Sequence, residues 1–357
     1  MKPIYLTALM TMILSASPTP AASDQTVYVG TRTREGRSQG LYRLTFNPAT
    51  GAMRDVRLAS ETVDPSFLAV HPKRALLFSV VATAEGQVRA FAIEPDGGLR
   101  LLNEVSSKGS GPAHIQVDRS GKWVAIANYI SGSAAVYRIE ADGRLSEAVD
   151  AVQHSGKSVH ARQAGPHAHS VNFSADNRHL YVADLGLDEV KVYEFNAETG
   201  KLTAGTSLRT SPGAGPRHLA LGASRVYVLN EISSSVSVFE AGLLLETVNA
   251  LPEGFQGEST AAEIVVDQAG KFIYTSNRGA DTIAVFRAGD KLRKVADVNV
   301  GKTPRGFVLS PDGRFMLVAS QAEDTVQAYR VNRTSGLLTA AGPPVKVGSP
   351  ICLRFGH

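Results

Sequence analysis

Histidine, arginine and glutamate side chains recur at two kinds of position in this sequence. One set stands at the beginnings of short apolar segments typical of strands: His114, His167, His169, Arg217, His218, Glu263 and Arg305. The other set stands at the ends of the segments that follow: Asn128, Asp184, Asn230, Glu231, Asn277 and Arg278. Histidine is a common general base, and arginine binds carboxylate and phosphate groups well. These residue types favour a site for a small carboxylate or phosphate ligand.

The spacing of the two sets predicts that they meet. If the paired segments form an antiparallel hairpin, the start of the first lies beside the end of the second. Both sets then converge on one face around an axis and line a funnel. The polar residues are unevenly distributed, since the segments that start at Pro65 and Pro350 carry Ser66-Phe67 and Ile351-Cys352 instead. We interpret this asymmetry as a sign of a ligand site.

Each group also has a structural interpretation. Side chains such as Asn128, Asn230 and Asn277 often bond to the backbone of turns. Glu231 and Glu263 could pair with the arginines in a structural network, because a buried guanidinium needs an anionic partner. His167-Ala-His169 could form a metal pair, but no third ligand is obvious nearby in the sequence. We therefore predict no metal site and no cofactor.

A repeated turn indicates the architecture. Seven times an apolar residue leads through a short polar stretch to a glycine: Gly51, Gly97, Gly143, Gly200, Gly242, Gly289 and Gly336. The spacings are 46, 46, 57, 42, 47 and 47 residues, and a four-stranded propeller blade fits such a period. The sequence therefore predicts an all-β, seven-bladed propeller with antiparallel blades. An open solenoid is the alternative.

Both ends of the repeat are incomplete. The last unit consists only of Pro350-Ile-Cys-Leu-Arg-Phe355, and residues 27–46 supply strands without a preceding inner strand. We predict that the C-terminal strand joins the N-terminal strands in one blade and closes the ring, which would remove exposed sheet edges.

Composition limits the class of protein. The chain has 357 residues, 43% of them hydrophobic, and a formal net charge of +4 without a dense Lys/Arg run. Nucleic acid is therefore not an expected partner. Residues 1–22 have the features of a secretory signal: Lys2, an apolar stretch and a small-residue cleavage site near residues 21–23. We predict one domain over residues 23–357, periplasmic or secreted, with no membrane attachment after cleavage.

Several catalytic motifs are absent or incomplete. Gly156-Lys-Ser158 and Gly301-Lys-Thr303 lack the first glycine of a phosphate-binding loop. No Gly-x-Ser-x-Gly sequence occurs, so a serine hydrolase is not supported. The single cysteine, Cys352, excludes an internal disulfide and fits a packed core position.

The chain resembles the seven-bladed propeller lactonases, which include propeller-type 6-phosphogluconolactonases and carboxy-cis,cis-muconate cyclase. The resemblance spans roughly residues 26–356, and its most specific segments are Gly165-Pro-His-Ala-His-Ser-Val171, Gly213-Ala-Gly-Pro-Arg-His218, Asn230-Glu231, Ser276-Asn-Arg-Gly279 and Pro304-Arg-Gly-Phe307. It implies metal-independent chemistry on a cyclic ester. By motif position it implies four catalytic residues: His169, Glu231, Arg217 and Arg278.

The resemblance leads to a mechanistic hypothesis for a sugar lactone. His169 or Glu231 would act as general base on a water molecule, and Arg217 and Arg278 would hold the developing oxyanion or a substrate acid group. The expected substrate-binding residues are His114, His167, His218, Glu263, Arg305, Asn128, Asn230 and Asn277.

Two other functions remain open at this point. Relatives in sugar-phosphate metabolism work in the cytosol, whereas this chain has an export signal, so a phosphorylated gluconolactone is not an obvious substrate. One alternative is a non-catalytic periplasmic propeller that binds a ligand or serves as a scaffold. The other is a muconate-type cyclase that forms a lactone. Fold alone does not decide among them.

Overall fold

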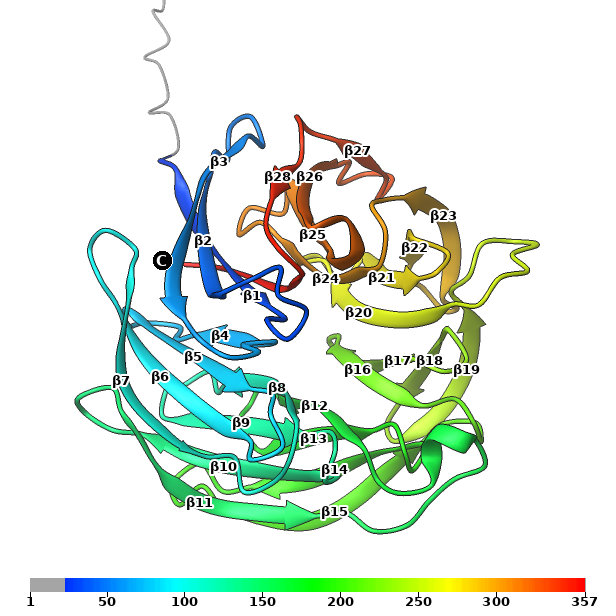
Figure 1. Cartoon of the computed structure of the whole chain (residues 1–357). Coiled ribbons are helices and arrows are strands. Elements are labelled where there is room, and N and C mark those ends of the chain that lie inside the picture. Colours follow the sequence, from blue (N-terminus) through cyan, green and yellow to red (C-terminus); the bar gives the residue numbers. More distant parts are fainter. Residues whose placement is uncertain (1–22, 357) are drawn as a thin grey trace, which may run out of the picture.

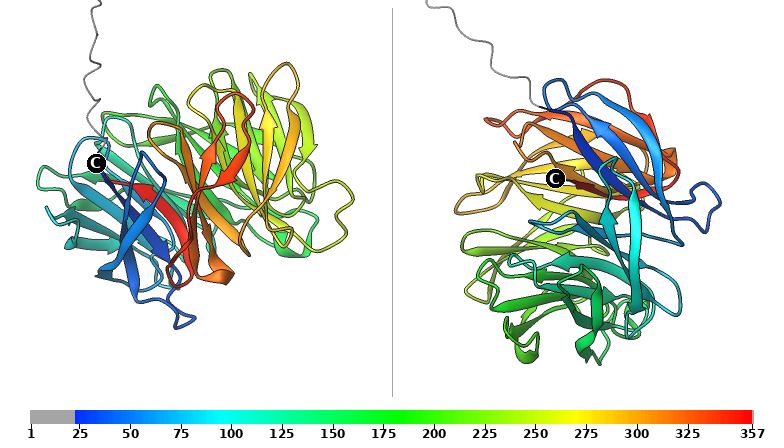
Figure 2. Two further views of the ribbon diagram at one scale, coloured as in Figure 1. Left: turned by 90° about the horizontal axis from the view of Figure 1, so that it is seen from above. Right: turned by 90° about the vertical axis from the view of Figure 1, so that its left-hand side faces the viewer.

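Seven β-sheets are arranged radially around a central axis (Figure 1), and the two perpendicular views show the blades side by side (Figure 2). The computed structural model describes residues 23–356, so the predicted secretory signal lies outside them. Each blade has four antiparallel strands along its main path. The predicted seven-bladed propeller is confirmed.

Six blades are formed by consecutive strands that follow one another from the axis outward. Their strands are β4 (Leu68–Val70), β5 (Leu76–Val81), β6 (Gln87–Ile93) and β7 (Leu99–Ser106); β8 (Pro112–Val117), β9 (Trp123–Asn128), β10 (Ser133–Ile139) and β11 (Leu145–Gln153); β12 (Ala168–Phe173), β13 (His179–Asp184), β14 (Glu189–Phe195) and β15 (Leu202–Arg209); β16 (Pro216–Leu221), β17 (Arg225–Asn230), β18 (Ser235–Glu240) and β19 (Leu243–Asn249); β20 (Thr260–Val266), β21 (Phe272–Arg278), β22 (Thr282–Arg287) and β23 (Arg293–Asn299); and β24 (Pro304–Leu309), β25 (Phe315–Ser320), β26 (Thr325–Val331) and β27 (Leu338–Ala340), with β28 (Val345–Lys346) also paired to β26.

The remaining blade closes the ring. Its strands are β29 (Pro350–Phe355), β1 (Gln25–Thr31), β2 (Gly40–Phe46) and β3 (Met53–Glu61). The C-terminal strand β29 pairs antiparallel with β1, with Val29 opposite Leu353. Both side chains are buried in one apolar cluster with Phe46 and Phe315. The predicted closure is therefore present, and every blade of the described chain has its inner strand.

Four of the repeated glycines allow an outer turn to pack closely against the preceding blade. Gly51, Gly143, Gly200 and Gly336 all have positive φ. A Cβ at these positions would meet Phe315, Leu76, Trp123 and Phe272, respectively, each of which stands at the start of a second strand in an adjacent blade. Glycine is the residue that permits both this backbone conformation and this close approach. Gly289 is the exception in the repeat, because its φ is not positive.

Two inner strands begin later than their prolines suggest. The first residue of β4 is Leu68, because Asp64 has a φ of 41° and the chain turns before pairing begins. The first residue of β12 is Ala168, because the amide of His167 donates to the Asp184 carboxylate instead of to the sheet. Helix is limited to two 3₁₀ turns, η1 (Ala161–Gln163) and η2 (Gln321–Glu323), and no helix in residues 23–356 could span a bilayer.

Candidate active site

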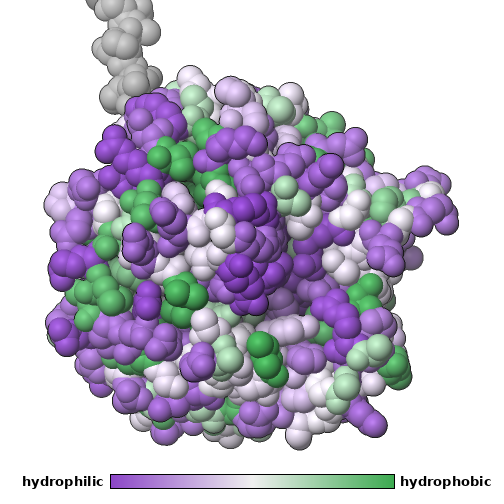
Figure 3. Space-filling model, viewed as in Figure 1, coloured by the Kyte–Doolittle hydropathy of each residue, from purple (hydrophilic) through white to green (hydrophobic). Residues whose placement is uncertain are grey.

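A cavity of about 320 Å³ occupies one mouth of the central axis. Space-filling atoms show a hollow at the centre of the ring bordered by hydrophilic side chains (Figure 3). Among the described residues that line the cavity, the charged ones are six arginines and one carboxylate: Arg32, Arg34, Arg162, Arg217, Arg278, Arg305 and Glu231. The cavity therefore has an excess of positive charge.

β-Bulges in the innermost strands determine which side chains reach this cavity. In β12, β16 and β24 the register with the second strand slips near the start of the inner strand. The extra residues within these slips are His169, Arg217 and Arg305. A bulge turns a side chain away from the regular alternation of a strand, and all three residues line the cavity.

Glu231 is the centre of the charged cluster. It follows β17 directly, and its Oε2 lies 2.9 Å from Arg217 Nε and 3.1 Å from Arg278 Nη2. Its Oε1 accepts a hydrogen bond of 2.6 Å from Arg162 Nη2. Only 5% of Glu231 is exposed. One buried carboxylate thus contacts three guanidinium groups from three different parts of the chain.

These contacts keep Glu231 ionised. Burial alone would raise its pKa, but Arg278, Arg217 and Arg162 together hold the pKa well below its usual range. A carboxylate so strongly stabilised is a weak base. Glu231 is therefore better suited to holding cations in place than to taking a proton from water.

Two of the arginines that contact Glu231 are also held by backbone carbonyls of β20. Arg217 donates to the carbonyl of Ala262, and Arg278 Nη2 donates to the carbonyl of Ala261 at 2.9 Å. Burial lowers the pKa of Arg217 to about 10, with Arg278 acting in the same direction and Glu231 opposing it. Both side chains are thus fixed before any ligand binds.

Arg305 differs from these arginines because no carboxylate contacts it among residues 23–356. Its side chain donates a long hydrogen bond to Gln321 Oε1 at 3.4 Å, and its buried Nε has no partner within that range. Burial, together with Arg278 and Arg217, holds the pKa of Arg305 well below its usual value. A guanidinium in this position would gain free energy from an anionic ligand.

His169 lies beside Glu231 as a neutral imidazole. Its Nε2 is 4.0 Å from Glu231 Oε2, and only 6% of the residue is exposed. Burial, then Arg217 and His218, hold the pKa of His169 well below its usual value, against the opposing effect of Glu231. The ring of Tyr129 contacts it edge to face at 5.3 Å between centroids. A neutral imidazole in this cavity can accept a proton.

Sequence reasoning missed Arg162, although a signal for it was present. The spacing of 57 residues between Gly143 and Gly200 exceeds the other glycine spacings and marks an insertion. That insertion is the segment between β11 and β12, which contains η1 and carries Arg162 to Glu231. Gln163 anchors the segment through a hydrogen bond to Asp188 Oδ1. Arg32, Arg34, Tyr129 and Phe67 also line the cavity without having been predicted.

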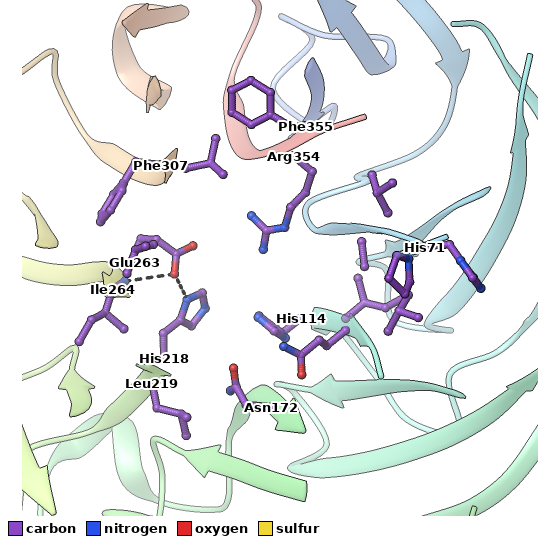
Figure 4. Close-up of a pocket in the computed structure, with 18 residues that line it drawn as sticks. His71, His114, Asn172, His218, Leu219, Glu263, Ile264, Phe307, Arg354 and Phe355 are labelled. Atoms are coloured by element: carbon purple, nitrogen blue, oxygen red, sulfur yellow. Dashed lines mark hydrogen bonds and ion pairs between the residues drawn. The ribbon is translucent and has the colours of Figure 1, made fainter. Parts of the chain in front are cut away.

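Three of the predicted binding residues lie at the opposite mouth of the axis. His114, His218 and Glu263 line a second cavity of about 450 Å³, together with Arg354 (Figure 4). His114 and His218 each follow the bulge position of their strand, so their side chains point away from the first cavity. The structure therefore separates these residues from His169, Arg217 and Arg305.

The other predicted residues contact neither cavity. Asn128, Asn230 and Asn277 are fully buried and bond to groups of their own or adjacent blades, such as Ser133, Ser235 and Thr282. Their contacts fit the structural interpretation. His167 Nδ1 donates to the carbonyl of Tyr129 at 2.9 Å, and its ring stacks on the Tyr129 ring. His167 thereby supports a wall of the first cavity. Within residues 23–356 no group of three or more His, Cys, Asp or Glu residues is arranged to hold a metal ion.

Comparison with known proteins gives consistent matches over almost the whole chain. The family model described as "Lactonase, 7-bladed beta-propeller" matches residues 26–355. A 6-phosphogluconolactonase of Bacillus subtilis is 33% identical over 344 residues, which cover 92% of this chain and 98% of that protein. The solved structure of a periplasmic gluconolactonase of Pseudomonas aeruginosa has a TM-score of 0.87 and 33% identity, covering 93% of this chain and 99% of that one. A solved protein of Lactobacillus plantarum has a TM-score of 0.89 and 32% identity, covering 94% and 100%.

Replacement of Glu231 by Gln should destabilise the fold at neutral pH. It leaves buried guanidinium groups without their counter-charge, and losing one partner of a buried ion pair costs about 3 kcal/mol or more. Because the pKa of Glu231 is lowered in the folded state, its contribution is fully present above the unfolded pKa of about 4.3 and is lost as pH falls further.

Urea unfolding of the native protein and of Glu231→Gln between pH 7 and pH 3 measures this effect. The difference in unfolding free energy should be largest near pH 7 and should shrink below about pH 4. Glu198→Gln, at an exposed turn, serves as the control and should change little. A difference that stays constant over the whole range would contradict the role of Glu231 as an ionised counter-charge.

Proposed function

Since the chain belongs to the seven-bladed β-propeller lactonase family, we propose that it is a hydrolase that opens a sugar lactone in the cavity around Glu231. The observation that carries this proposal is an ionised carboxylate bound by three arginines beside a neutral, buried histidine. Fixed cations beside a proton acceptor suit the attack of water on an ester carbonyl.

His169 is the general base in this proposal. Glu231 is unsuited to that role, because the arginines lower its pKa and occupy both of its oxygens. His169 is neutral and has one nitrogen on the cavity side. Once His169 accepts a proton, the nearby Glu231 carboxylate stabilises the imidazolium.

The reaction then proceeds in two proton transfers. His169 Nε2 takes a proton from water while the water oxygen forms a bond to the lactone carbonyl carbon, and the carbonyl oxygen becomes an oxyanion. Arg217 or Arg278 stabilises this oxyanion through a guanidinium already held by Glu231 and by carbonyls of β20 (Thr260–Val266). The carbonyl then re-forms, the ring C–O bond breaks, and the leaving oxygen takes the proton from His169.

The charge of the cavity favours a substrate with an acidic group. Arg305 has no carboxylate partner among the described residues. Arg32 lines the same cavity, whereas Arg34 is already bound to Asp64 at 2.6 Å. A phosphate or carboxylate on the sugar would pair with Arg305. The name of the Bacillus subtilis relative, 6-phosphogluconolactonase, is consistent with this.

The place of action is proposed from the N-terminal sequence. Residues 1–22 read as a secretory signal, and one structural relative is named as a periplasmic gluconolactonase. We propose that a single propeller domain, starting near residue 23, acts in the periplasm or outside the cell.

Replacement of His169 by Asn should lower kcat by about 10²-fold or more on a responsive lactone, because the general base is lost. A pH-stat assay with five- and six-membered sugar lactones, neutral and phosphorylated, measures acid release directly. His179→Asn, a partly exposed histidine on β13, is the matched control and should retain activity. No acceleration of any lactone by the native protein would instead support the non-catalytic binding function.

Replacement of Arg305 by Gln should raise KM about tenfold for a lactone that carries phosphate or carboxylate. A hydrogen bond to a charged group contributes roughly 1.5–3 kcal/mol. The same change should have little effect on KM for the neutral lactone of the same ring size. Arg178→Gln, at an exposed site, controls for general loss of positive charge. Equal effects on both lactones would exclude Arg305 as the anion-binding residue.

Expression of the full chain in a Gram-negative host should place the protein in the periplasm with a new N-terminus near residues 21–24. Cell fractionation followed by mass spectrometry of the intact protein measures both properties. A cytosolic protein that still contains residues 1–22 would refute export through this segment.

A further inference from the structure

A column of aromatic rings on the axis separates the two cavities. His218 contacts His169 on one side and His114 on the other, with ring centroids 5.2 Å and 5.1 Å apart. Phe67 packs against both His114 and His218, at 4.2 Å and 5.6 Å. His218 therefore lies directly behind the proposed base and is only 3% exposed.

Glu263 determines which nitrogen of His218 carries a proton. Glu263 Oε1 lies 2.7 Å from His218 Nδ1 and also accepts a hydrogen bond of 3.1 Å from the amide of Ile264 (Figure 4). Because Glu263 Oε1 accepts a hydrogen bond from the Ile264 amide, this oxygen carries no proton of its own. It therefore accepts a hydrogen bond from the imidazole as well. His218 then donates from Nδ1, and its Nε2 has a free lone pair.

Two buried nitrogens in this column have no hydrogen-bond partner within the described part of the chain. They are His218 Nε2 and His169 Nδ1, and their rings are in edge-to-face contact. A buried polar atom without a hydrogen-bond partner is unfavourable. If His169 Nδ1 carries a proton, it can be donated to His218 Nε2 after a small ring rotation or through one water molecule, which satisfies both atoms.

The cavity side of His169 agrees with this tautomer. His169 Nε2 lies 4.0 Å from the Glu231 carboxylate, which is too long for a hydrogen bond. A protonated Nε2 beside an ionised carboxylate would be expected to form one. The distance fits an Nε2 that has a lone pair facing the cavity.

We propose that Glu263 and His218 are positioning residues that hold His169 in the Nδ1–H tautomer, so that its Nε2 is free to accept a proton from water. The inference rests on the proposed function of His169 as general base. It gives the residues at the opposite mouth a role in the reaction although they do not touch the first cavity.

The arrangement also predicts a response to acid. The groups that face Glu263 are His218, His114, Arg354 and Arg217. Burial raises the pKa of Glu263, and Arg354, Arg217 and His114 oppose this. When pH falls through that raised pKa, the Glu263–His218 pair takes up one proton. The Nδ1 proton of His218 passes to Glu263, which becomes the donor of this hydrogen bond, and the incoming proton binds His218 Nε2. His218 Nε2 can then no longer accept from His169, so turnover should fall.

Nitrogen-15 NMR of the native protein labelled at histidine tests the tautomer directly. The His169 signals, identified by their absence in His169→Asn, should show a protonated Nδ1 and an unprotonated Nε2 at pH 7. A protonated Nε2 on His169 would overturn the inference. This measurement does not depend on turnover, so it separates failure of the tautomer assignment from failure of the proposed function, which His169→Asn kinetics address.

Two variants of His218 test the effect on catalysis. His218→Phe retains a ring but removes the acceptor, and should lower kcat about 10- to 100-fold with KM changed less than about twofold, because the wrong tautomer of a base is inactive. His218→Gln can present an amide oxygen near the position of Nε2 and should recover much of this loss. Equal losses in both variants with an unchanged His169 tautomer would contradict the proposal.

Asp118→Asn provides a control for general destabilisation. Asp118 is fully buried, and its carboxylate accepts hydrogen bonds from the amides of Lys122 and Trp123 in the turn between β8 and β9. Loss of this carboxylate should lower the free energy of unfolding without altering the NMR tautomer of His169. A shift of that tautomer in Asp118→Asn would show that general destabilisation, and not the Glu263–His218 pair, controls it.

Discussion

The candidate site depends on the pairing of one buried carboxylate with several guanidinium groups. Glu231 contacts Arg217, Arg278 and Arg162, which come from β16 (Pro216–Leu221), β21 (Phe272–Arg278) and the insertion before β12 (Ala168–Phe173). Without this counter-charge, the desolvation and mutual repulsion of the arginines would oppose closure of the ring around them. The same pairing makes Glu231 a poor base and leaves proton transfer to its neutral neighbour, His169. The need of the buried arginines for a counter-charge thus explains why Glu231 is a counter-ion and His169 is the proposed base.

The innermost strands of the repeated blades contribute side chains to two different cavities, one at each mouth of the axis. A single extra residue near the start of a strand aims His169, Arg217 and Arg305 at one mouth of the axis. The residue after the bulge in β8 (Pro112–Val117) and β16 is His114 or His218, and these face the other mouth. Because neighbouring positions on a strand point to opposite sides, one strand can contribute to both cavities. The aromatic column between them is where the two sites touch.

The architecture could be predicted from the sequence because it depends on local signals that repeat. The glycine turns, the hairpins and the incomplete first and last units are each visible in short segments, and together they imply a closed ring. The division of the polar residues between the two mouths could not be predicted. It depends on the β-bulges near the starts of β8, β12, β16 and β24, and no particular residue type in the sequence marks these bulges. Arg305 directly follows Pro304 and His114 stands two residues after Pro112, and these adjacent positions of the repeat face opposite ends of the axis. Arg162 reaches Glu231 because the inserted loop folds toward the cavity. The sequence shows the length of this loop but not the direction in which it folds.

The excess of arginine bears on how the proposed base could work at neutral pH. Burial and the nearby cations hold the pKa of His169 low. Before a substrate binds, its imidazole is therefore a weak proton acceptor. Arg217 and Arg305 are among the groups that lower this pKa. An anionic substrate paired with Arg305 would offset part of their positive charge, and the pKa of His169 would rise toward the pH at which a general base is most effective. On the proposed mechanism, the acidic group of the substrate therefore contributes to binding and also activates the residue that begins the reaction.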